Sequence, residues 1–155
     1  MKNRLFLLGG IFKRLGTFDM STFNGRLVLQ KTIYFLQSFG INLNYAFSLY
    51  WYGPYCPELT KEGYELEKHF QETSSIKFVQ EKTEKKFAKF IKFLGDKSND
   101  GKKLELLASI HLIKNINPNL TKQEIITRVR NKHSYFDDKK MCLEYWDYLE
   151  KFNLL

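Results

Sequence analysis

The stretch NGRLVLQKTIYFLQSF, residues 24–39, predicts the helix around which the rest of the chain folds. Its main apolar stripe, at helical spacing, consists of Leu29, Ile33 and Leu36. Further apolar side chains lie on the other faces, so we expect a central helix that is buried nearly all round. Asn24 is placed to cap the start of this helix, and Gly40 is placed to end it.

Three polar side chains interrupt this apolar helix, namely Arg26, Gln30 and Lys31. A partly buried ammonium group needs a partner, because burial of an unpaired charge is costly. Glu58, which follows the next turn of the chain, is the carboxylate we expect to pair with Lys31. The favoured interpretation is a structural clamp made of Arg26, Gln30, Lys31 and Glu58. The alternative is a functional charged pair.

The stretch SLYWYGPYCPEL, residues 48–59, concentrates aromatic side chains around a Gly-Pro pair. The alternation in residues 46–52 predicts a short strand, and Gly53-Pro54 predicts a tight turn. We call this region the aromatic corner, and its predicted partner-binding residues are Tyr50, Trp51, Tyr52, Gly53, Pro54, Tyr55 and Glu58. Large amphipathic rings on a rigid turn are typical of residues that dominate protein–protein binding.

The remaining segments predict a mainly helical chain. Helices are expected at residues 2–15, 57–70, 82–95, 104–116, 122–133 and 138–152, and a second short strand at 75–80. Thr121 and Glu124 have the spacing of a capping box. No linker divides the chain, so the fold prediction is one compact helical domain over residues 1–155, with a small β-ribbon in a winged-helix-like arrangement.

The net charge of +8 makes a polyanion a candidate partner, although only five of the 25 basic residues are Arg. One predicted helix carries a lysine face, which consists of Lys82, Lys85, Lys86, Lys89 and Lys92. Phe93 lies among these lysines by helical spacing, so it could stack on a nucleic-acid base if exposed. The other interpretation is a solvated lysine surface with Phe93 covered by another element.

No motif for catalysis stands out. The three histidines at 69, 111 and 133 lack metal-ligand spacing, and Gly9-Gly10 lacks the context of a phosphate-binding loop. Neither Ser48 nor Cys56 lies in a nucleophile signature. We therefore predict a protein that is not an enzyme, with no metal, cofactor or small-molecule substrate.

The cysteines and the N-terminal segment indicate the cellular compartment. Two cysteines, Cys56 and Cys142, are too few for a disulfide framework. Lys13-Arg14 interrupts the apolar N-terminal run far short of a membrane span. We therefore expect a cytoplasmic protein with no membrane partner.

Two motifs taken together resemble a known family. NGRLVLQKTIYFLQ followed by FSLYWYGPYCPELT resembles the YwgA-type family of prokaryotic proteins, and LELLASIHLIK resembles one of its C-terminal helices. A more distant similarity is to the Panacea, or SocA-like, antitoxin domain, whose members neutralise toxins by direct protein contact. The family's marked residues correspond to Gly25, Arg26, Leu29, Gln30, Lys31, Tyr52, Gly53, Pro54, Tyr55 and Leu59. Cys56 replaces the serine that usually follows this motif.

The resemblance implies a small, mostly helical domain without enzymatic activity. The leading prediction is a protein-interaction module, antitoxin-like or an adaptor, that binds a partner protein through the aromatic corner and the helix beside it. The alternative is a winged-helix-like DNA-binding regulator that uses the lysine face. A homodimer is compatible with the amphipathic helices that end the chain.

Overall fold

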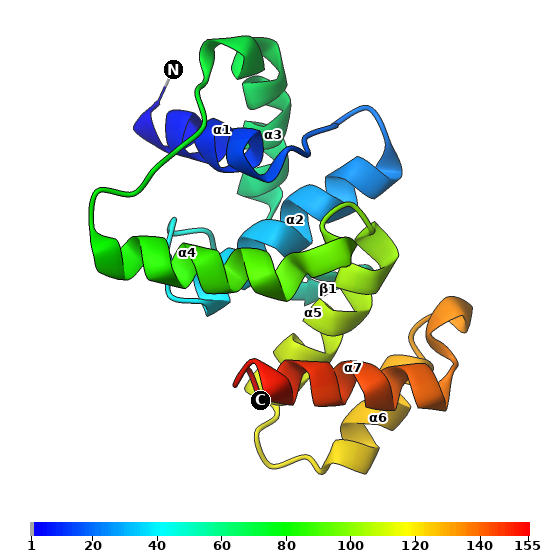
Figure 1. Ribbon diagram of the computed structural model, residues 1–155. Coiled ribbons are helices and arrows are strands. Elements are labelled where there is room, and N and C mark those ends of the chain that lie inside the picture. Colours follow the sequence, from blue (N-terminus) through cyan, green and yellow to red (C-terminus); the bar gives the residue numbers. More distant parts are fainter. Residues whose placement is uncertain (1) are drawn as a thin grey trace.

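A computed structural model describes residues 2–155 and shows a mainly helical fold with one small antiparallel sheet (Figure 1). The α-helices are α1 (Asn3–Leu15), α2 (Phe23–Ser38), α3 (Pro57–His69), α4 (Glu81–Leu94), α5 (Gly101–Ile116), α6 (Lys122–Arg130) and α7 (Lys139–Lys151). The strands are β1 (Ser48–Tyr50) and β2 (Gly53–Tyr55), and three short 3-10 turns occupy Phe70–Glu72, Gly95–Lys97 and Ser134–Phe136. The predicted fold class, helical with a small β-ribbon, is confirmed.

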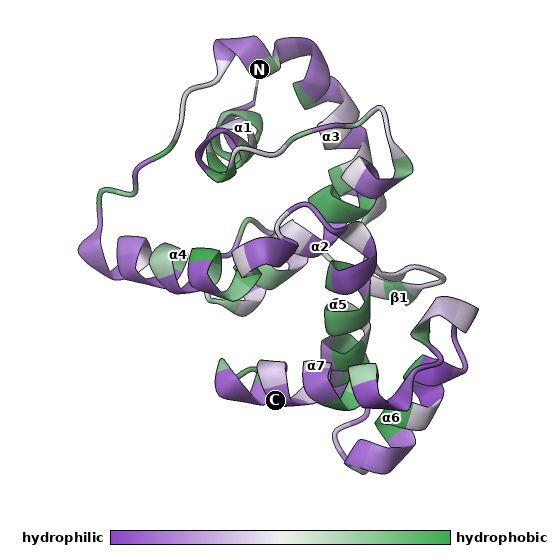
Figure 2. Cartoon of the chain, turned by 45° about the vertical axis from the view of Figure 1, so that its right-hand side comes forward, coloured by the Kyte–Doolittle hydropathy of each residue, from purple (hydrophilic) through white to green (hydrophobic). Residues whose placement is uncertain are grey.

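Helices α2 and α5 form the centre of the molecule (Figure 1). Helix α2 packs along α5 more extensively than any other two described elements pack together, and it also contacts α3, α4 and β2. All residues of α2 from Leu27 to Leu36 are buried, as the sequence predicted. Helix α5 continues from this centre to α6 and α7, and Figure 2 shows its hydrophobic middle. Burial of these two apolar helices supplies the main stabilising contribution.

The start of α2 differs in detail from the prediction. Thr22, not Asn24, is the N-cap, and its hydroxyl accepts a hydrogen bond from the amide of Gly25 at 2.9 Å. The side chain of Asn24 instead spans two elements, because its carbonyl accepts a bond from the amide of Gly101 at 2.8 Å. Asn24 therefore joins the first turn of α2 to the first turn of α5.

Residues 75–80 do not form the predicted second strand. This segment crosses α1, where the amide of Ile76 donates to the carbonyl of Gly10 at 3.1 Å. A Cβ atom at Gly9 would collide with the side chain of Thr73, so the glycine pair allows the close approach. Ile76 and Phe78 are half-buried against the core, which explains the alternation that resembled a strand.

The two strands pair as an antiparallel hairpin, in which Ser48 faces Tyr55 and Tyr50 faces Gly53. The tight turn falls at Trp51-Tyr52, just before the predicted Gly-Pro position. Gly53 has a φ of +86°, a left-handed conformation that favours glycine. Helix α3 begins directly after β2, with Pro57 in its first turn.

None of the helices within residues 2–155 combines the length and the apolar composition needed to span a bilayer.

Candidate functional site

The hairpin presents four successive large side chains to solvent. We call Leu49, Tyr50, Trp51 and Tyr52 the hairpin tip; their exposed fractions are 41%, 49%, 65% and 41%. Phe23, at the start of α2, is also exposed and contacts the ring of Tyr52 edge-on at 4.9 Å. Scattered single apolar residues are normal on a protein surface, whereas a contiguous group of this kind is a candidate interaction site.

The backbone of the hairpin tip is fixed by His133, which follows α6. His133 Nε2 donates a hydrogen bond to the carbonyl of Trp51 at 2.7 Å, so this nitrogen carries the hydrogen. The imidazole ring lies between two tyrosines, stacked on Tyr52 at 5.5 Å and on Tyr135 at 4.8 Å. The exposed rings are therefore held in place by an element far away in the sequence.

Beneath the hairpin lies a polar cluster, which consists of Lys31, Glu105, Lys132, His133 and Tyr135; its buried centre is Lys31 and Glu105, and Tyr135 reaches the surface. The hydroxyl of Tyr135 donates to Glu105 Oε1 at 2.9 Å, and His133 Nε2 lies 3.2 Å from Glu105 Oε2. Lys31 Nζ donates to the carbonyl of Pro54 at 2.7 Å. Lys31 is 1% exposed and Glu105 is fully buried. This cluster attaches β2 to α2 and α5 from below.

Burial controls the ionisation of the cluster. Loss of hydration lowers the pKa of Lys31 to about 7, although the charge of Glu105 opposes this shift. It also lowers the pKa of Lys132 to about 8 and raises the pKa of Glu105 above its usual value. Lys132 Nζ is buried and has no hydrogen-bond partner within residues 2–155. Charge in this cluster is therefore costly, and its members depend on one another.

Gln30 and Glu58, both assigned to the clamp, have different roles. The side chain of Gln30 donates to the carbonyl of Cys56 at 2.9 Å and accepts from the amide of the same residue at 2.9 Å. It therefore attaches the start of α3 to α2. The predicted ion pair between Lys31 and Glu58 is wrong, because Glu58 binds Arg4 of α1 at 2.5 Å and is largely exposed.

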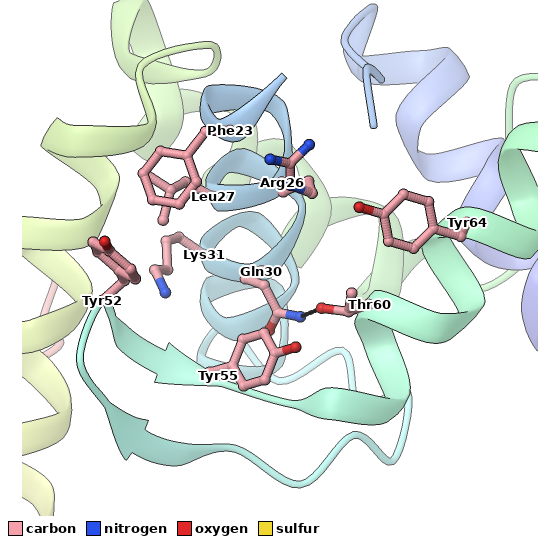
Figure 3. A pocket seen from close by; sticks show the side chains of 9 residues that line it. All are labelled: Phe23, Arg26, Leu27, Gln30, Lys31, Tyr52, Tyr55, Thr60 and Tyr64. Carbon is pink, nitrogen blue, oxygen red and sulfur yellow. Dashed lines mark hydrogen bonds between the residues drawn. The ribbon is translucent and has the colours of Figure 1, made fainter. Parts of the chain in front are cut away.

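A pocket of about 200 Å³ opens between α2, the hairpin and α3 (Figure 3). We call it the Arg26 pocket, and its lining residues are Phe23, Arg26, Leu27, Gln30, Lys31, Tyr52, Tyr55, Thr60 and Tyr64. Arg26 donates to the carbonyl of Met20 at 3.0 Å and makes no ion pair with a described residue. Three of the predicted clamp residues, Arg26, Gln30 and Lys31, therefore meet the aromatic corner at one site, and Glu58 does not.

The lysine face is exposed along α4, except for Lys86, which is half-buried. Of the two interpretations of Phe93, exposure among these lysines is wrong and coverage by other elements is confirmed, because Phe93 is fully buried. It packs against Phe35 on α2, Phe39 directly after α2, and Phe152 directly after α7. Of the N-terminal basic residues, Arg4 and Arg14 do not add free charge to this surface, because they are paired with Glu62 and Glu84.

The other chemistry-bearing residues are accounted for by packing. Cys56 and Cys142 are buried free thiols, and His69 pairs with Glu72 at 3.1 Å. His111 accepts or donates a 2.6 Å hydrogen bond with Tyr34 in the core, and burial lowers its pKa to about 4. Across residues 2–155, no three His, Cys, Asp or Glu side chains gather as a metal site would require.

Sequence reasoning missed Glu105, Lys132, His133 and Tyr135. One signal was present, because Glu105 interrupts the apolar run LELLASIHLI of α5. A carboxylate in such a run needs a buried partner. The partners come from the segment after α6, and nothing local in the sequence links that segment to the hairpin.

No protein-family model, curated protein or solved structure matches this chain.

Proposed function

We propose that this protein is a non-enzymatic interaction module that binds a partner protein through the hairpin tip and the adjoining start of α2. The observation that carries the proposal is the run of four exposed large side chains on a hairpin whose backbone is fixed from below. A rigid aromatic surface loses little conformational entropy when it binds, so its buried area contributes efficiently to affinity. The resemblance to YwgA-type and Panacea-like motifs supports an antitoxin-like or adaptor role.

The alternative, a nucleic-acid-binding regulator, has weaker support. Its aromatic contribution, Phe93, is buried, and the positive charges of Arg4 and Arg14 are compensated by carboxylates. The lysine face remains exposed on α4, but Lys85 pairs with Glu81 at 3.3 Å. Surface lysines without an exposed ring are typical of a solvated helix.

The test is a pull-down of the tagged protein from cells of its source organism, with nuclease treatment and a series of salt concentrations. We expect a stoichiometric protein partner that stays bound at about 0.5 M salt, where attraction between surface charges is largely screened. Trp51→Ala should weaken binding of that partner at least ten-fold, because central aromatic residues dominate binding energy.

The matched control is Phe6→Ala, which removes another exposed ring, on α1, and should leave binding unchanged. Recovery of nucleic acid alone, lost as salt rises, would contradict the proposal and favour the lysine face. Equal losses in the two variants would also contradict it.

A further inference from the structure

The Arg26 pocket combines apolar walls with positive charge. Its aromatic walls are Phe23, Tyr52, Tyr55 and Tyr64, and its two basic groups are Arg26 and Lys31, of which burial lowers the pKa of Lys31 to about 7. None of its nine lining residues is acidic. A ligand that suits this lining has an apolar body and a negative charge at one end.

The cationic groups differ in how far they are compensated. Lys31 donates to the carbonyl of Pro54, and the charge of Glu105 acts on it from below. Arg26 uses one nitrogen for the carbonyl of Met20 and makes no ion pair with residues 2–155. The nearby carboxylate of Asp19 accepts hydrogen bonds from the amide and hydroxyl of Ser21 and is attracted to Arg26 only at longer range, without forming an ion pair with it. The guanidinium of Arg26 is therefore the group best placed to receive an external carboxylate.

The aromatic rim supplies further hydrogen-bond donors. Within the described chain, the hydroxyls of Tyr52, Tyr55 and Tyr64 form no hydrogen bond that would occupy them. Figure 3 shows the hydroxyl of Tyr64 pointing toward the middle of the pocket, on the side of Arg26. Gln30, in contrast, is fully engaged with Cys56 and Thr60 and shapes the floor.

The size of the pocket limits its occupant. A volume of about 200 Å³ is below the usual lower limit of roughly 300 Å³ for drug-sized ligands and cofactors. It suits a single large side chain. The pocket also adjoins the hairpin tip through Tyr52, so a peptide segment could contact both places at once.

We propose that the Arg26 pocket binds an acidic peptide segment of the partner protein, in which an apolar side chain enters the pocket and an adjoining Asp or Glu carboxylate binds Arg26. The inference rests on the proposed function and specifies the chemistry of the partner. The net charge of +8 favours association with such a segment at long range.

The experiment is a selection of displayed random peptides against the wild-type protein, followed by affinity measurements on the enriched peptides. We expect peptides with an aromatic or aliphatic residue beside Asp or Glu. Arg26→Gln should lower their affinity about ten-fold, the loss expected for one charged hydrogen-bonded pair. Tyr64→Phe, which removes only a hydroxyl, should lower it less.

Arg128→Gln is the matched control, because it removes the same charge from an exposed position on α6. Equal losses for Arg26→Gln and Arg128→Gln would overturn the inference, since total charge would then explain binding. Enriched peptides without acidic residues that still require Trp51 would overturn the inference and leave the proposed function standing. A library without binders, or binders that ignore both Trp51 and Arg26, would contradict both.

Discussion

The two sides of the β-hairpin differ in their exposure to solvent, although the side chains involved are only a few residues apart. One side of the hairpin, its upper face, exposes the rings of the hairpin tip, and the other, its lower face, covers the buried side chains of Lys31 and Glu105. Exposed aromatic residues contribute little to folding, whereas buried charges cost stability unless every partner is in place. The comparison indicates that the lower face maintains the structure and the upper face is free to serve a partner.

The largest expected effect is on the lower face. Glu105→Ala should lower the free energy of unfolding by about 3–5 kcal/mol, because it leaves the buried Lys31 and the other members of the polar cluster without their carboxylate. Urea unfolding followed by circular dichroism measures the change. Glu144→Ala, at an exposed carboxylate on α7, should change stability by less than about 0.5 kcal/mol. Similar losses of stability in Glu105→Ala and Glu144→Ala would contradict the structural role assigned to the charged groups beneath the hairpin.

A smaller effect is expected at the turn itself. A Cβ atom at Gly53 would lie 2.8 Å from Ser109 Oγ and would need a left-handed backbone, so Gly53→Ala should cost about 3 kcal/mol. Gly16, at the end of α1, is also left-handed but has nothing within 4 Å of a Cβ atom. Gly16→Ala should therefore cost only about 1–2 kcal/mol. Thermal unfolding of Gly53→Ala and Gly16→Ala separates the backbone strain from the contact between position 53 and Ser109 of α5. Equal losses of stability in the two variants would show that this contact is unimportant.

The ionisation of Lys31 predicts a pH dependence of stability. Burial lowers its pKa in the folded state from 10.5 to about 7, so at pH values between these limits the unfolded chain binds a proton that the folded chain does not. Stability should then rise with pH by up to about 1.4 kcal/mol per pH unit, with a further contribution from Lys132 above its pKa of about 8. Lys31→Met should reduce this slope.

Urea unfolding at several pH values from neutral to mildly alkaline measures the slope. Lys89→Met, on the exposed lysine face, is the control and should leave the slope unchanged. A wild-type slope that persists in Lys31→Met would mean that the ammonium group is not desolvated by the hairpin.

The smallest effect on stability is expected on the upper face. Trp51→Ala removes a largely exposed ring but keeps the carbonyl that His133 binds. The free energy of unfolding should therefore change by less than about 1 kcal/mol. Differential scanning calorimetry measures this. A large loss would place Trp51 among the residues that maintain the fold.

Parts of this arrangement follow from local sequence, and parts do not. The periodicity of α2 and the glycine at position 53 predicted the central helix and a turn, because both signals depend on neighbouring residues. The predicted strand at residues 75–80 is wrong. Ile76 and Phe78 alternate with polar residues because they pack against the core, and the segment pairs with no other described strand.

The interior of the site depends on contacts between distant segments. The sequence predicted that Lys31 is buried, and this is confirmed, but its predicted partner Glu58 pairs with Arg4 instead. Glu105 and His133 lie 28 residues apart and face the hairpin only after α5 and α6 have packed. Local sequence patterns do not predict that packing.

Site-specific photo-crosslinking in cells of the source organism tests most directly whether the hairpin tip is the binding surface. A benzophenone-bearing phenylalanine would replace Trp51 in one variant and Phe6 in the other. We predict a discrete crosslinked protein from position 51 and none from position 6. The same crosslinks from both positions, or none from position 51, would contradict the assignment of the hairpin tip as the surface that meets the partner.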